Sequence, residues 1–307
     1  MRLLYLIFLF FLFHPIFAQD NEIGSNSVLI SDTIIIKENP VTAELKFVNY
    51  LIANAQYNDA LFALEKLQED NVNISPIQFD SIHYYTGWIN YFNKRFGKAI
   101  SSFEKVSNKT DLYYNAKYYT SFCYAYTNNF DAAWDVLINL DISQRNELKD
   151  FHNFQLACLA LLKRDLISFE KYSSSFKFSN YNYAKEEEQL LSYYNDIKSE
   201  KKKSGFLAAL ISAVIPGMGK FYAGYTGLPF GALFTTLPLA IVATESFIKA
   251  GLLSPQFIIL GSLFGVFYIG NIWGSALSVN AIKKEKYAEI NYNILFDMHI
   301  PLRRIFE

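Results

Sequence analysis

Cysteine and histidine are scarce in this chain, and their scarcity limits the chemistry that it can perform. The 307 residues include two cysteines and four histidines. A disulfide-stapled domain needs several cysteine pairs, and a zinc site needs His, Cys or carboxylate ligands at short spacing. Neither pattern occurs, and the sequence has no phosphate loop or nucleophile elbow. We therefore expect a protein that is not an enzyme and that uses neither a metal nor a cofactor.

The two cysteines, Cys123 and Cys158, each lie in an apolar helical stretch. A free thiol in such a place packs as a small apolar group. We expect two buried thiols, with a disulfide between neighbouring helices as the alternative.

A surplus of charge of either sign is also lacking. Lys and Arg number 28 and Asp and Glu number 29, which gives a net charge of −1. Proteins that bind nucleic acid present a basic face to it. We therefore do not expect nucleic acid as a partner.

Charged residues are almost missing from residues 204–283. Residues 227–247 form an apolar run with Glu245 as its only charge, and residues 255–282 form a longer run with none. A helix needs roughly twenty apolar residues to cross a bilayer, and a soluble core helix seldom goes so long without a polar face. We predict that residues 204–283 are a transmembrane module built on a helical hairpin.

Glycine recurs at four-residue spacing in both apolar runs. Small residues at positions i and i+4 share one helix face and let helix backbones approach closely in lipid. We expect these glycines to pack helices together, either within the chain or between copies in a homo-oligomer. The six glycines are Gly227, Gly231, Gly261, Gly265, Gly270 and Gly274.

A third apolar run, residues 206–224, is interrupted by a proline and carries a glycine–aromatic motif. Proline disfavours helix in the residue before it, so the run is a bent span, a re-entrant segment or an interfacial helix. The motif, with Gly227 and Gly231 after it, resembles the F-Y-x-G signature of small two-transmembrane-helix domains. That resemblance implies the topology of a helix pair. Lys220 departs from the family, which tends to place a polar pair before the Phe. The motif residues are Pro216, Gly217, Gly219, Phe221, Tyr222 and Gly224.

Residues 1–18 are typical of a secretory signal peptide. Arg2 precedes an apolar run, residues 3–13, and Ala18 is a small residue at the expected cleavage point. We predict cleavage after Ala18, with an uncleaved anchor as the alternative. Residues 19–40 follow as an extended, β-prone arm.

A helical pattern with a 34-residue period runs through residues 41–180. Weaker copies of the pattern, around Val48 and Ala157, flank two good ones. The period resembles that of the tetratricopeptide repeat. The resemblance implies roughly four helical hairpins stacked as an α-solenoid with a concave binding surface; the alternative is an irregular helical bundle. Gly87, Phe96, Ala99 and Phe103 recur 34 residues later as Ser121, Phe130, Ala133 and Leu137.

Two further segments flank the transmembrane module. Residues 181–203 are predicted to be a linker helix, with the charge cluster at residues 185–188 on its solvated face. Residues 284–307 form a tail in which apolar and polar residues alternate, a period that indicates a half-buried β-strand. A lone strand needs a partner. We favour the N-terminal arm, and another copy of the chain or another protein are the alternatives. The alternating residues are Ile290, Tyr292, Ile294, Phe296, Met298 and Ile300.

Lysines stand at both ends of the module, at residues 201–203 and at Lys283, Lys284 and Lys286. Matching flanks favour an even number of crossings. Basic flanks prefer the cytoplasm, but long domains translocate regardless of charge, so we give the signal peptide more weight. We favour two spans in the inner membrane, with the repeats and the tail in the periplasm. Three spans with a cytoplasmic tail are the alternative. In addition, the lysines at 201–203 precede the apolar region and are placed to contact lipid phosphates.

The predicted fold is therefore mainly α: a tetratricopeptide-like solenoid, a transmembrane helical hairpin and a short terminal strand. This combination indicates a non-enzymatic scaffold that binds other cell-envelope proteins or peptides and acts in envelope assembly or secretion. An oligomeric transport or channel component is the alternative. An intramembrane enzyme is disfavoured because Ser212 and Ser275 are isolated hydroxyls. Tyrosine suits wet interfaces, and the candidate protein-binding residues are Tyr84, Tyr91, Tyr114 and Tyr118.

Overall fold

A computed structural model of the chain describes residues 39–69 and 74–306. The predicted signal peptide and residues 19–38 of the predicted β-prone arm lie outside this range. Residues 40–307 form one unit. All regular structure in the described residues is helical, so the mainly α class is confirmed.

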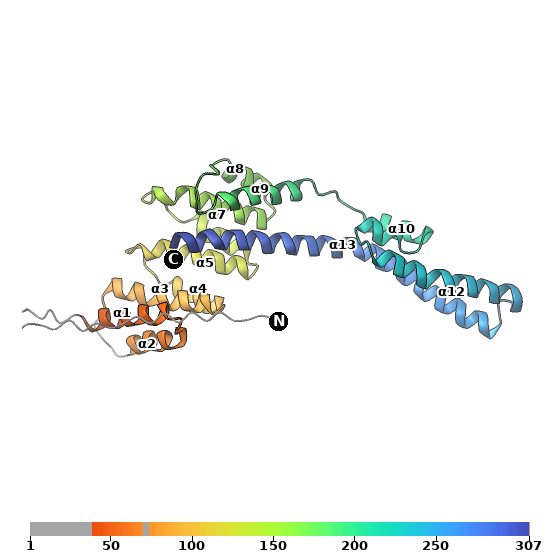
Figure 1. Cartoon of the computed structure of the whole chain (residues 1–307), viewed down its shortest axis with the longest axis horizontal. Helices are drawn as coiled ribbons and strands as arrows, with labels where there is room; N and C mark the ends of the chain where they lie inside the picture. Colours follow the sequence, from red (N-terminus) through yellow and green to blue (C-terminus); the bar gives the residue numbers. More distant parts are fainter. Residues whose placement is uncertain (1–38, 70–73, 307) are drawn as a thin grey trace, which may run out of the picture. The chain divides into compact units, whose positions relative to one another are not determined.

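Eight helices pair into four hairpins in the order of the sequence, and successive hairpins contact each other (Figure 1). The same turn closes all four. Its left-handed residue stands two positions before each second helix, at Ala55, Lys94, Asn128 and Arg164, with φ of 58°, 58°, 62° and 60°. The hairpins are α1 (Pro40–Ala53) with α2 (Tyr57–Glu69), α3 (Pro76–Phe92) with α4 (Phe96–Phe103), α5 (Leu112–Tyr126) with α6 (Phe130–Ile138), and α7 (Lys149–Leu162) with α8 (Leu166–Ser173).

The two helices of the central hairpins approach closely at the small residues of the 34-residue pattern. A Cβ added at Gly87 would lie 2.6 Å from the ring of Phe103, which is fully buried. One period later, the Ser121 hydroxyl donates to the carbonyl of Ala133 over 2.8 Å. A larger side chain at either position would push its hairpin apart. Small residues at Gly87 and Ser121 therefore let the two helices of these hairpins cross closely.

The segment predicted as a linker helix is α9 (Ala184–Lys198), and it packs against α7, α8 and α13. The prediction of a fully solvated charge cluster is wrong for two of its residues, because Glu186 and Glu187 are each 2 % exposed. Glu187 accepts a hydrogen bond from the backbone N–H of Phe178 over 2.7 Å. Glu186 pairs with Arg304 over 3.1 Å. Buried carboxylates need such partners, and Arg304, 118 residues later in the chain, was not expected here.

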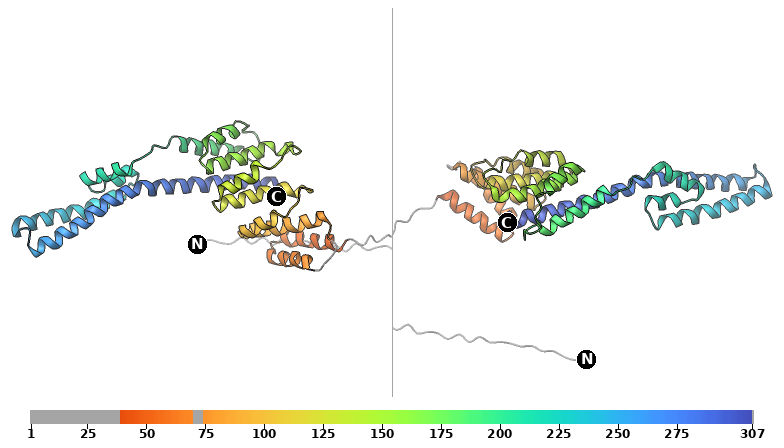
Figure 2. Two further views of the ribbon diagram at one scale, coloured as in Figure 1. Left: turned by 180° about the vertical axis from the view of Figure 1, so that it is seen from behind. Right: turned by 90° about the horizontal axis from the view of Figure 1, so that it is seen from above.

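Among the described residues, two helices are long and apolar enough to cross a membrane, within residues 230–250 and 255–306. They run side by side in all the views of Figures 1 and 2. The interrupted apolar run forms two short helices that pack on the second of them. The elements of this module are α10 (Gly205–Val214), α11 (Met218–Ala223), α12 (Leu228–Ala250) and α13 (Pro255–Phe306).

The predicted C-terminal strand is wrong, because α13 continues without a break to Phe306. Its buried residues include Ile290, Ile294, Met298 and Leu302, which are four apart and share one helix face. The same residues fit a two-residue alternation, which explains the misreading. A helix satisfies its own backbone hydrogen bonds and needs no partner strand. Tyr292, which the strand would place on the buried side, is 68 % exposed.

A helix and a strand in this segment would give different losses of unfolding free energy when two of its side chains are truncated. Ile294→Ala removes a fully buried side chain and should lower the free energy of unfolding by about 2–4 kcal/mol. Tyr292→Ala should change it by less than about 1 kcal/mol. Denaturant unfolding of the full chain in detergent, followed by tryptophan fluorescence, measures both. Equal losses would contradict the helix, because a strand places the two side chains on one face.

Candidate functional site

The last turns of α13, residues 283–306, lie against α5, α7 and α9 (Figure 1). These are the first helices of the third and fourth hairpins and the helix that follows them. Ile290, Ile294, Met298 and Leu302 belong to the same buried cluster as the cores of those hairpins. The C-terminal part of α13 therefore covers part of the hairpins and shares their core.

Polar contacts hold this part of α13 in register. The Gln155 amide donates to the backbone carbonyl of Met298 over 3.0 Å. The Arg164 guanidinium donates to Asn291 Oδ1 over 2.8 Å, and it also lies 4.4 Å from the centroid of the Tyr287 ring. Because these partners come from α7 and from the turn after it, they fix both the rotation and the axial position of the helix.

Asp297 is a buried acid of α13 at this contact. It is 3 % exposed, and its Oδ2 accepts a hydrogen bond from the Tyr193 hydroxyl over 2.9 Å. Burial raises the pKa of Asp297 to about 6, and the nearby Glu186 carboxylate adds to the rise. The hydroxyl of Tyr193 and the charge of Lys185 act in the opposite direction. The carboxyl therefore titrates well above the usual range for aspartate.

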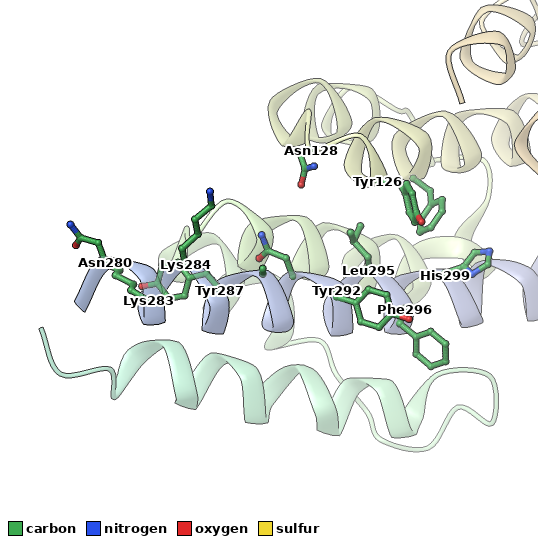
Figure 3. A pocket seen from close by; sticks show the side chains of 13 residues that line it. Tyr126, Asn128, Asn280, Lys283, Lys284, Tyr287, Tyr292, Leu295, Phe296 and His299 are labelled. Atoms are coloured by element: carbon green, nitrogen blue, oxygen red, sulfur yellow. The ribbon is translucent and has the colours of Figure 1, made fainter. Parts of the chain in front are cut away.

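A cavity of about 710 Å³ opens between α13 and the end of α5 (Figure 3). Figure 3 shows its side chains spread along α13, with Tyr126 and Asn128 opposite them. A smaller cavity of about 150 Å³ shares Phe122, Tyr126 and His299 with it and reaches α3 and α4. We call the two cavities together the aromatic groove.

The aromatic groove combines apolar walls with positive charge. Tyr126, Tyr292 and Phe296 supply wall surface, and Tyr292 and Phe296 are among the exposed large apolar side chains of the chain. Lys283 and Lys284 line the larger cavity, whereas Lys94 and Arg303 line the smaller one. Among the described residues, neither lining contains a carboxylate.

His299 lies where the two cavities meet. Burial lowers its pKa to about 4, and the charge of Arg303 adds to the fall. The imidazole is therefore neutral at pH 7, and it contacts the Tyr91 hydroxyl. A neutral ring in an aromatic wall can donate or accept one hydrogen bond to a ligand without adding charge. The described residues contain no cluster of metal-ligating side chains, at this histidine or elsewhere.

Three of the four tyrosines selected from the sequence lie in the core. Tyr84, Tyr91 and Tyr118 are at most 6 % exposed, so their rings serve packing within the chain, although Tyr91 also lines the smaller cavity. Tyr114 is half-buried beneath the Arg145 guanidinium, which lies 5.1 Å from its ring centroid. Partner binding by this set stays a prediction, for which Tyr114 is the most accessible member.

Sequence reasoning missed Tyr126, Tyr292 and Phe296. Tyr292 and Phe296 were assigned to the buried side of a strand. A helical reading of residues 283–306 would have placed both off the Ile290–Ile294–Met298 stripe and so identified an exposed aromatic face.

The glycine–aromatic motif folds back on α10. A Cβ added at Gly219 would lie 1.9 Å from the carbonyl oxygen of Ala208, so only glycine allows this contact. Gly217 and Gly224 have φ of 93° and 125°, a region that favours glycine. The Tyr222 hydroxyl accepts from the backbone N–H of Ser204 over 3.3 Å, which closes the fold. The motif is thus a packing device. Pro216 is partly buried in the turn between the helices, and Phe221 is exposed.

A buried pair of hydroxyls joins this motif to α13. The Oγ atoms of Ser212 and Ser275 are 2.7 Å apart. Ser212 also accepts from the backbone N–H of Gly219 over 2.9 Å, and Ser275 donates to the carbonyl of Asn271 over 2.8 Å. Sequence reasoning treated the two serines as isolated. Their role here is to hydrogen-bond polar groups inside an apolar module, where an unpaired group is costly.

The six glycines at four-residue spacing have little to pack against within the chain. Among the described residues, a Cβ added at Gly227, Gly231, Gly265 or Gly270 would meet no atom within 4 Å apart from the adjacent backbone of its own helix. One added at Gly261 would meet only Phe257 of its own helix, and one at Gly274 would lie 3.8 Å from Lys220. The four glycines that meet no atom are therefore not used for close packing within the chain. Packing between copies stays a prediction.

Both cysteines are buried free thiols, as the sequence indicated. Burial raises the pKa of the Cys123 and Cys158 thiols. A neutral, inaccessible thiol is a poor nucleophile, so neither belongs to a reactive site.

Substitution of Gly219 should be far more costly than substitution of Gly231. Gly219→Ala places its methyl group against the Ala208 carbonyl, and overpacking of this kind costs about 1–3 kcal/mol. Gly231→Ala meets open space and should be neutral or slightly stabilising, because alanine favours helix. Thermal unfolding of the full chain in detergent compares the two. Equal stability of the variants would refute the close contact between α10 and α11.

Asp297→Asn should remove one pH dependence of stability. The folded-state pKa of about 6 exceeds the unfolded value of about 3.9, so the folded state binds more protons between these values. Its stability therefore falls as pH rises from about 4 to about 6 and is level above that. The variant should gain stability relative to the wild type across this window. His152 and His299, whose pKa values burial lowers to about 4, are present in both proteins and cancel in the difference. A difference that does not change with pH would show that Asp297 titrates normally.

Comparisons with known proteins gave no relative from which a role could be transferred. No family model, no curated protein and no solved structure matches the chain.

Proposed function

We propose that the chain is a non-enzymatic, membrane-anchored scaffold whose hairpins, a tetratricopeptide-like solenoid, bind a segment of another cell-envelope protein. The observation that carries this proposal is the aromatic groove. Its larger cavity, about 710 Å³, lies within the size range of ligand sites. Its continuation into the smaller cavity past Phe122 and Tyr126 makes it elongated, which suits a peptide segment.

The composition of the groove defines the ligand class. Aromatic walls at Tyr126 and Phe296 offer large contact areas at low entropic cost, as binding hot spots do. Cations at Lys284 and Lys94, in the larger and the smaller cavity respectively, complement carboxylates. The best-matched ligand is therefore a peptide with apolar or aromatic side chains flanked by acidic residues.

The hairpin face already supports a helical segment, residues 283–306 of the chain itself. Helix-in-groove binding is a common mode of peptide recognition. The repeated turn at Ala55, Lys94, Asn128 and Arg164 supports the solenoid assignment, since stacked copies of one hairpin generate a continuous binding face.

Two features of the chain support a location for the scaffold. The two long apolar helices support anchoring by two spans in the inner membrane. The signal-peptide pattern of residues 1–18 supports export of the hairpins to the periplasm. A periplasmic scaffold of this kind would act in cell-envelope assembly or secretion.

Site-specific photocrosslinking tests the groove. A photoreactive phenylalanine analogue replaces Tyr126 or Phe296 in the full chain, expressed in intact cells. Control chains carry it at Phe62 or Ile167, which are 69 % and 83 % exposed on α2 and α8. The groove positions should crosslink a specific envelope protein, and the control positions should not.

Two outcomes would overturn the proposal. Crosslinks of equal yield from Phe62 and Ile167 would show that capture is not specific to the groove. Crosslinks only between copies of this chain would instead favour the alternative, an oligomeric membrane component.

A further inference from the structure

A further cavity, which shares only Asn280 and Lys283 with the lining of the aromatic groove, lies where the apolar module begins. It has a volume of about 430 Å³ and is bounded by the segment before α10 and by the middle of α13. These two segments are some eighty residues apart in sequence. We call it the basic cavity.

The basic cavity gathers five lysines around one glutamate. The single acid in the lining is Glu200. One of its carboxylate oxygens accepts a hydrogen bond from the Tyr287 hydroxyl over 2.5 Å. The net charge of the lining is thus strongly positive, and like charges at this density need a counter-ion. The lysines are Lys201, Lys202, Lys203, Lys283 and Lys286.

One of these lysines is fixed by the backbone. Lys203 Nζ donates to the carbonyl of Ala223, the last residue of α11, over 3.0 Å. It also lies 5.9 Å from the centroid of the Tyr222 ring. The glycine–aromatic motif therefore holds one wall of the basic cavity in place. Lys202 and Lys286 are exposed on their elements and are available to a ligand.

The remaining wall of the basic cavity is apolar. Ala223, Val279 and Ile282 line it, and Ala223 and Val279 belong to the small buried cluster that joins α10, α11 and α13. Apolar residues 255–282 of α13 end at this level, and the apolar helix α10 starts just after Lys203. A ligand here meets charge on one side and the beginning of the apolar module on the other.

We propose that the basic cavity binds the phosphate-bearing headgroup of an anionic phospholipid. Several lysines at the end of a spanning segment attract anionic lipid, and the apolar wall suits the glycerol and first acyl carbons of the same molecule. A free phosphate shares the charge but would leave Val279 and Ile282 uncovered. The assignment rests on the proposed membrane anchoring, and it does not depend on a ligand in the aromatic groove.

Lipid competition on the purified full chain tests the assignment. The protein, stripped of lipid in a nonionic detergent, is mixed with micelles containing equal amounts of phosphatidylglycerol and phosphatidylcholine. Native mass spectrometry then gives the ratio of the two bound lipids. The variant Lys202→Gln/Lys283→Gln/Lys286→Gln leaves the structural Lys203 in place. At about fivefold per lysine, it should lower the preference for phosphatidylglycerol by about a hundredfold.

Two matched variants separate the site from charge alone. Lys66→Gln/Lys98→Gln/Lys109→Gln removes the same charge from exposed positions on α2, on α4 and in the connection between α4 and α5. This variant should keep the preference of the wild type. Lys202→Arg/Lys283→Arg/Lys286→Arg keeps the charge of the basic cavity and should retain most of it. Thermal unfolding of each variant checks that the fold is intact.

Three results would overturn the proposal. The glutamine variant of the basic cavity could keep its preference, or the hairpin control could lose as much. Inorganic phosphate added alone could displace phosphatidylglycerol, which would make the ligand a soluble anion. Failure of membrane anchoring is distinguishable from all three, because the wild type would then retain neither lipid.

Discussion

The apolar contact that Ile294, Met298 and Leu302 make with the hairpins is the interaction on which the rest of the molecule depends. All three side chains are fully buried, and burial of each contributes about 1.5–3 kcal/mol. Their sum, about 5–9 kcal/mol, is similar to the whole stability of a typical domain. Without this contact, the hairpin face would expose its apolar surface and α13 would end as an unsupported helix. The aromatic groove exists only because one of its walls is α13 itself.

Elements whose signal is local in the sequence could be predicted well. The small residue at Gly87 and the helical period of the hairpins reflect contacts within one or two helices. Run 227–247, with Glu245 as its only charge, and the charge-free run 255–282 reflect the solvent around a single helix. The buried state of Cys123 and Cys158 follows from the same local pattern. Family membership in the tetratricopeptide repeat stays a prediction, because no comparison bears on it.

Long-range contacts explain what could not be predicted. Ile290, Ile294 and Met298 satisfy a two-residue and a four-residue period at once, and only the position of the hairpins decides between strand and helix. From the sequence, Glu186 is predicted to be solvated; in the structure it is buried and pairs with Arg304 from the end of the chain. The same holds for the site: the aromatic face of α13 becomes a wall only when the end of α5, at Tyr126, lies opposite it.

The uninterrupted course of α13 has a mechanical consequence. At 1.5 Å per residue, its 52 residues extend over about 78 Å, and a hydrogen-bonded helix is stiff along its axis. The apolar half and the half embedded in the hairpins therefore tilt as a single lever. A change of about 10° in the tilt of the apolar half would swing the far end of the 283–306 segment by about 6 Å. Under the proposed membrane anchoring, an apolar helix longer than the local bilayer thickness can adjust by tilting. A change in bilayer thickness would then alter the orientation of the groove.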